Sequence, residues 1–117
     1  MHRLLIVDDE DHIRKLYRDF LIREGYEVKT VASGEEALDM VATGNFDLVV
    51  LDIELEDASG LDILKQFKEK HPHLPIILNS AYSTYKSDFN TWLADAYIQK
   101  SSDIKPLKDK IKELVEI

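Results

Sequence analysis

Short aliphatic runs alternate along the chain with segments of helical periodicity. Three of these runs are continuous, as expected for strands that are buried on both faces of a parallel sheet: residues 4–7, 48–51 and 76–78. Residues 28–31 alternate between apolar and polar side chains, which favours a weaker strand at an edge of the sheet. Residues 96–99 predict the last strand.

Apolar residues recur at helical spacing between and after these strands. The stripes predict five helices, within residues 13–21, 37–41, 61–67, 85–93 and 104–115. A capping box at Ser33–Glu36 begins the second helix, and an Asp103 cap with Pro106 in the first turn begins the fifth. Strand and helix alternate five times, which predicts an α/β fold: a doubly wound, five-stranded parallel sheet with helices on both faces.

Composition limits the classes of protein to which the chain can belong. Its 117 residues suffice for one domain, 1–117, and it has no cysteine, which excludes disulfides and thiolate metal sites and fits the cytoplasm. A net charge of −8 makes direct binding of nucleic acid a poor prospect. No apolar run is long enough for a membrane span.

The negative charge is concentrated in one part of the chain. Between Lys29 and Lys65 there is no basic residue, but there are nine acidic ones. Most of these form a solvated face, whereas a few of them are expected to gather around a hard cation.

Polar side chains follow the predicted strands at their carboxyl ends, which meet at one edge of the sheet. They are Asp8 and Asp9 after the first strand, Asp52 after the third, Asn79 and Ser80 after the fourth, and Lys100 after the fifth. Three carboxylates repel one another. One ammonium and one divalent cation would neutralise them, and an oxygen-only ligand set favours Mg²⁺. A carboxylate in such surroundings is equipped to attack a phosphoryl group.

The order and spacing of these motifs resemble the response-regulator receiver domain of two-component signalling. The matching segments are Leu4–Glu10, Gly25–Val28, Ala32–Leu38, Asp47–Ile53, Gly60, Ser80–Tyr82 and Ala94–Lys100. The resemblance implies a flavodoxin-like fold with strand order 2-1-3-4-5. It also implies a signalling module that promotes only its own phosphorylation and dephosphorylation, and is otherwise no enzyme.

The resemblance further implies a role for each matching residue. Asp52 would be the phosphoacceptor, and Mg²⁺ would be held by Asp8, Asp9, Asp52 and the backbone carbonyl of Glu54. Lys100 and Ser80 would bind phosphoryl oxygens. Tyr97 would turn between exposed and buried positions as Ser80 moves, although a plain packing role for this aromatic side chain stays open. Glu54 and Tyr82 occupy the positions that tune the lifetime of the phosphoryl group.

The family likeness also suggests partners. A sensor histidine kinase, a phosphotransfer protein or a small phosphodonor would supply the phosphoryl group. A downstream protein, or a second copy in a phosphorylation-dependent dimer, would dock on the face made by residues 85–93, 96–99 and 104–115; a monomer is the other possibility. No output domain follows in the sequence, so the chain is either a stand-alone receiver or an excised domain.

Two positions depart from the usual family pattern. Ser101 follows Lys100 where the family usually has proline, often with a cis peptide; a cis Lys100–Ser101 bond would cost about 3 kcal/mol. Leu55–Glu56 stands where the family often has Met-Pro, which makes that loop freer and more acidic.

Three other functions compete with this interpretation. A flavodoxin-like cofactor binder would need a phosphate-cradling loop, and the chain has only four glycines, with acids after the first strand. A phosphatase with an aspartate nucleophile would need a second Asp two residues after Asp52, where Glu54 stands. A receiver-like module that binds a partner without being phosphorylated is the remaining alternative.

Overall fold

The structure is a computed structural model, and it describes residues 1–81 and 93–116. The described elements are β1 (Arg3–Val7), α1 (Asp11–Arg23), β2 (Glu27–Val31), α2 (Gly34–Thr43), β3 (Leu48–Asp52), α3 (Gly60–Lys70), β4 (Ile76–Ser80), β5 (Ala96–Gln99) and α4 (Lys105–Val115). None of the described helices has the length and apolar character that crossing a membrane requires.

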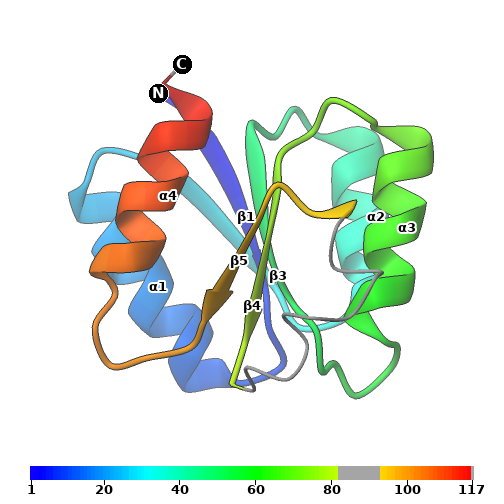
Figure 1. Cartoon of the computed structure of the whole chain (residues 1–117), viewed down its shortest axis with the longest axis horizontal. Coiled ribbons are helices and arrows are strands. Elements are labelled where there is room, and N and C mark those ends of the chain that lie inside the picture. The colour runs from blue at the N-terminus through cyan, green and yellow to red at the C-terminus, as the bar shows by residue number, and fades with distance from the viewer. Residues whose placement is uncertain (82–92, 117) are drawn as a thin grey trace.

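The five strands form one parallel sheet in the order β2-β1-β3-β4-β5. This confirms the predicted fold class and strand order, and it places β2 at an edge, as the sequence pattern predicts. Helices α1 and α4 cover one face of the sheet, and α2 and α3 cover the other (Figure 1). The N-terminus and the C-terminal end of α4 lie close together at the end of the sheet opposite to the carboxyl ends of β4 and β5 (Figure 1).

Alternation along the central strands divides the core into two layers. In β1, Leu4 and Ile6 belong to the layer under α1 and α4, whereas Leu5 and Val7 belong to the layer under α2 and α3. All four side chains are buried, because the sheet is covered on both faces. This burial explains why the central strands are continuous aliphatic runs.

Several predicted boundaries need small corrections. Asp52, Asn79 and Ser80 do not follow their strands but are the last residues of β3 and β4. The backbone continues the ladder through them, because strand pairing uses main-chain groups whatever the side chain is.

Helix starts follow the sequence more closely. Ser33 caps α2, with its hydroxyl accepting a hydrogen bond from the Glu36 N–H, as the capping box predicts. The N-cap of α4 is Ile104 and not Asp103, although Asp103 Oδ1 still accepts a hydrogen bond from the Lys105 N–H at 3.0 Å. The helix expected over residues 85–93 lies outside the described residues, except for Leu93, which is exposed.

Candidate functional site

Three charged side chains from different strands meet at the carboxyl edge of the sheet. Asp8 follows β1, Asp52 ends β3 and Lys100 follows β5. Lys100 Nζ lies 2.8 Å from Asp8 Oδ2 and 3.2 Å from Asp52 Oδ2. The prediction that these three side chains lie close together is therefore confirmed.

This charged cluster is buried, and burial governs its electrostatics. Asp8 is 2% exposed and Asp52 4% exposed. Burial, and then the charge of Asp8, raise the pKa of Asp52 to about 6, although Lys100 and the Glu54 N–H oppose the shift. Burial by itself would lower the pKa of Lys100, but its contacts with Asp8 and Asp52 outweigh this effect and raise the pKa.

Asp9 and Glu10 extend the cluster toward solvent. One carboxylate oxygen from each of Asp8, Asp9 and Glu10 lies within 4.8 Å of the others. The set contains only oxygen donors, and Asp9 and Glu10 are open to solvent, so water can complete the coordination shell that Mg²⁺ prefers. Lys100 supplies one positive charge against several carboxylates, so a divalent cation would also relieve the excess negative charge. These residues fit Mg²⁺.

The loop between β3 and α3 is held in place from both sides. The Glu54 N–H donates to Asp52 Oδ1 at 3.1 Å, and the Glu56 N–H donates to Asp9 Oδ2 at 3.1 Å. On the other side, the Asp57 carboxylate accepts hydrogen bonds from the first two N–H groups of α2, those of Gly34 at 3.0 Å and Glu35 at 3.3 Å. These hydrogen bonds lower the pKa of Asp57, with the bond from Gly34 contributing most. This second cap of α2 was not predicted from the sequence.

Gly60 fixes how closely α3 approaches the phosphoacceptor candidate. A Cβ atom at this position would lie 2.2 Å from the Asp52 carbonyl oxygen and 2.6 Å from Ile53 Cα, both of them backbone atoms. The Gly60 N–H also donates to the Ile53 carbonyl at 2.7 Å. Glycine is therefore required by close backbone packing eight residues after Asp52.

Ser80 shares a small cavity with the charged cluster. The cavity has a volume of about 120 Å³ and is lined by Glu10, Asp52, Glu54, Ser80, Ala81 and Lys100. Ser80 is fully buried, and its strand neighbour in β5 is Gln99. A hydroxyl, a carboxylate and an ammonium therefore border one space of a size suited to a small polar group.

The remaining predicted residues differ in their placement. Tyr97 is half-buried and packs against the core layer under α2 and α3. Tyr82 lies outside the described residues, so its position stays a prediction. No cis peptide bond occurs in the described residues, so the Lys100–Ser101 bond is trans.

A hydrogen-bonded pair that the sequence analysis did not identify lies next to this site. Position 17 lies within the apolar stripe predicted over residues 13–21, but the Tyr17 hydroxyl donates to Asn79 Oδ1 at 2.9 Å. Burial raises the pKa of Tyr17, and the positive charge of Lys100 opposes the rise. The available signal was Asn79 itself, a polar residue that extends an otherwise aliphatic strand.

Comparison with known proteins identifies the family. The family model of the response regulator receiver domain matches residues 4–112. The chain belongs to this family.

Two similar solved structures share the fold. The response regulator TrrA of Thermotoga maritima, in complex with Mg²⁺ and BeF, is 47% identical, with a TM-score of 0.95 over 97% of this chain and 99% of that chain. TrrA bound to histidine kinase ThkA gives a TM-score of 0.94 at 47% identity, over 98% of this chain and 99% of that chain.

Curated relatives are longer than this chain. The transcriptional regulatory protein DltR of Streptococcus agalactiae is 38% identical over 94% of this chain and 50% of its own length. The probable transcriptional regulator ycf27 of Cyanidium caldarium is 35% identical over 97% of this chain and 46% of its own length. The chain therefore spans about half the length of these relatives.

Proposed function

We propose that Asp52 accepts a phosphoryl group and that this makes the domain a switch in two-component signalling. The observation that carries the proposal is the position of the Asp52 carboxylate, which is buried at the end of β3, beside Asp8 and 3.2 Å from the Lys100 ammonium. A nucleophile held next to a fixed positive charge is preorganised for attack on an anionic group.

The transfer exchanges one bond to phosphorus for another. An Asp52 oxygen forms the new bond, while the bond from phosphorus to the donor breaks and its electron pair leaves with the donor. Lys100 would stabilise one phosphoryl oxygen, and the Ser80 hydroxyl, which borders the same cavity, would stabilise another. Asp8, Asp9, Asp52 and the Glu54 carbonyl would hold Mg²⁺, which neutralises charge on the transferring group when it is bound.

The donor and the output follow from the same proposal. The complex of TrrA with a histidine kinase supports a kinase as donor, and a phosphotransfer protein or a small phosphodonor would present the same phosphoryl group. Movement of Ser80 toward the phosphoryl oxygens would let Tyr97 turn. The face formed by residues 85–93, β5 and α4 would then bind a protein target or a second copy. Lifetime tuning by Glu54 and Tyr82, and a location in the cytoplasm, belong to this proposal as well.

A direct experiment tests the phosphoacceptor. The protein is incubated with Mg²⁺ and acetyl phosphate, and its intact mass is measured before and after hydroxylamine. We expect the mass of one phosphoryl group to be gained and then lost, because hydroxylamine cleaves acyl phosphates. Asp52→Asn should gain nothing, whereas Asp57→Asn, a change to an exposed acid in the same loop, should still be phosphorylated.

The opposite results would contradict the proposal in distinct ways. If the Asp52→Asn variant gained the same hydroxylamine-sensitive group, another residue would be the acceptor. If the unmodified protein gained nothing while it bound Mg²⁺, the alternative of a phosphorylation-independent interaction module would be favoured.

A further inference from the structure

A chain of two hydrogen bonds links α1 to β5 beside the charged cluster; the first is buried and the second partly buried. The Tyr17 hydroxyl donates to Asn79 Oδ1 at 2.9 Å, and Asn79 Nδ2 donates to the Ile98 carbonyl at 2.9 Å. Tyr17 is 4% exposed and Asn79 2% exposed. A buried polar group without a partner destabilises a fold, so the Tyr17 hydroxyl and the Asn79 amide each need the other as a hydrogen-bond partner.

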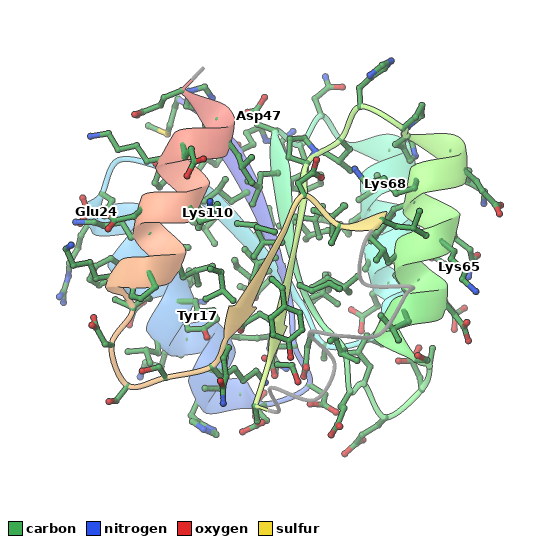
Figure 2. The ribbon with its side chains drawn as sticks, in the orientation of Figure 1. Tyr17, Glu24, Asp47, Lys65, Lys68 and Lys110 are labelled. Carbon is green, nitrogen blue, oxygen red and sulfur yellow. The ribbon has the colours of Figure 1, made fainter. Side chains whose placement is uncertain are left out.

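Strand register places this chain directly beside the phosphoacceptor candidate. Asn79 is the register partner of Asp52 on one side and of Ile98 on the other. Side chains at paired positions point to the same face of a sheet, and residues two apart in a strand do so as well. Asp52, Asn79 and Lys100, two residues after Ile98, therefore share the face that α1 covers. Figure 2 shows Tyr17 on the α1 side of the sheet.

Packing alone does not require polar residues at these positions. Ile77, two residues before Asn79 on the same face, belongs to the apolar layer under α1 and α4. A Phe and an aliphatic side chain at positions 17 and 79 would fill similar space without burying polar groups. The hydroxyl and the amide instead add directional bonds to a particular backbone atom, the Ile98 carbonyl.

That backbone atom lies where the sheet gives little support. β5 is an edge strand, and β4 alone pairs with it among the strands that the structure describes. Beyond its last residue, the Lys100 N–H donates to the Ser80 carbonyl at 2.6 Å. Two side-chain hydrogen bonds hold this end of β5 in the described residues: the exposed one from Gln99 Nε2 to the Ala81 carbonyl at 3.3 Å, and the one from the buried Asn79 to Ile98.

We propose that Tyr17 and Asn79 are positioning residues, which hold the end of β5 so that the Lys100 ammonium stays in contact with Asp52. The proposal rests on the phosphoacceptor role of Asp52. Neither side chain is assigned a contact with the phosphoryl group or the metal. Their effect is exerted through the backbone at Ile98.

The first test is made without metal or phosphodonor. Amide hydrogen exchange is measured by NMR at the Lys100 N–H in the unmodified protein, in Tyr17→Phe and in Tyr26→Phe. Tyr26 is a buried tyrosine in the same core layer, so its variant makes the same chemical change. We expect exchange at Lys100 to rise about tenfold in Tyr17→Phe and to stay unchanged in Tyr26→Phe. Equal protection in all three proteins would overturn the proposal.

The second test separates positioning from stability. In Tyr17→Phe the maximal rate of phosphorylation by acetyl phosphate should fall about tenfold, while the Mg²⁺ concentration for half-maximal rate stays within about twofold. The double variant Tyr17→Phe/Asn79→Leu removes both buried polar groups together and should regain stability in urea, but it should not regain the rate.

Two outcomes would overturn the positioning role. One is a rate that returns with stability in the double variant. The other is a half-maximal Mg²⁺ concentration that shifts as much as the maximal rate falls. If the unmodified protein itself gained no phosphoryl group, the proposed function would fail instead, and the exchange measurement at Lys100 would still decide whether the chain of bonds holds β5.

Discussion

Two lysine–aspartate pairs lie at opposite ends of the sheet with the same contact distance. Lys68 Nζ lies 2.8 Å from Asp95 Oδ2 at the amino end, and Lys100 Nζ lies 2.8 Å from Asp8 Oδ2 at the carboxyl end. Lys68 extends from α3, which flanks the sheet in Figure 2. The two pairs nevertheless differ in what surrounds them.

Charge is balanced at the amino end and unbalanced at the carboxyl end. Lys68 also donates to the Leu74 carbonyl, and Asp95 also accepts from the Ile76 N–H, so one cation meets one anion with neutral partners around both. Lys100, by contrast, faces Asp8 and Asp52, both of them buried. The first pair joins α3 to the starts of β4 and β5, whereas the second leaves buried negative charge for a further cation.

The two ends also differ in cavity size, and the larger cavity lies at the end where charge is balanced. The larger hollow, about 530 Å³, lies at the amino end and is lined by residues that include Phe46, His71 and His73. The one beside Asp52 has a volume of about 120 Å³. The smaller cavity is the better functional candidate, because buried and unbalanced charge borders it. One of its lining groups, the Asp52 carboxyl, has a raised pKa.

The largest expected effect comes from removing each lysine in turn. In metal-free protein, Lys100→Met should lower the unfolding free energy by about 4 kcal/mol, because it leaves two buried carboxylates unpaired. Lys68→Met should cost about 1 kcal/mol, because Asp95 is partly exposed and keeps its backbone bond. Urea denaturation measures both. Mg²⁺ should restore much of the loss in Lys100→Met and none in Lys68→Met; equal losses would show that the two pairs are equivalent.

The pH dependence of stability gives the next largest effect. Because the pKa of Asp52 is about 6 in the folded protein and near 3.8 in the unfolded chain, folding becomes less favourable as pH rises through this interval. The penalty is absent below about pH 4 and reaches about 3 kcal/mol above pH 6. Without metal, Asp52→Asn should therefore be more stable than the unmodified protein at pH 7.5, and the two should converge near pH 4. If urea denaturation gave the same difference in unfolding free energy between the two proteins at every pH, the raised pKa of Asp52 would be contradicted.

Mg²⁺ should raise the stability of the fold through the residues at the carboxyl end and not through those at the amino end. At a concentration one hundred times the dissociation constant, a ligand that binds only the folded state adds about 2.7 kcal/mol to the unfolding free energy. Thermal melting should rise with Mg²⁺ in the unmodified protein and in Asp95→Asn, because Asp95 lies outside the site. Asp9→Asn should lose most of the rise. A melting temperature that does not change over a saturating titration would argue against the metal site.

The smallest effect concerns an acid at the carboxyl end that is exposed. Asp57 caps α2, and its pKa is lowered in the folded protein. Its effect on how stability changes with pH is therefore opposite to that of Asp52. The cap stabilises the fold above the unfolded pKa and is lost as pH falls through the folded one. Asp57→Asn should cost about 1 kcal/mol or less at pH 7 and nothing at low pH. A cost that persists at low pH would show that the cap depends on shape and not on charge.

Sequence reasoning succeeded where one physical requirement determines the pattern. Burial on both faces requires continuous aliphatic strands, so β1, β3 and β4 were predictable, and their parallel order then brought Asp8, Asp52 and Lys100 to one edge. The ends of β3 and β4 were misplaced, because polar residues such as Asp52 and Asn79 can still pair through the backbone.

Hydrogen bonds between distant segments were not predictable in the same way. Asp57 meets the start of α2, and Tyr17 meets Asn79, across long separations in the sequence. Periodicity indicates which face a residue occupies, but it carries no information on which partner its polar atom finds. Position 17 falls within the apolar stripe predicted over residues 13–21, but the stripe does not indicate that the Tyr17 hydroxyl donates to Asn79.

The contact at Gly60 has a mechanical consequence. No atom larger than hydrogen fits between Gly60 at the start of α3 and the Asp52 backbone, so the two segments are in direct contact. A shift of the carbonyl at the end of β3 toward α3 would therefore push directly on the first turn of this helix. The end of β3, which carries Asp52, and the start of α3 are thus coupled by direct backbone contact.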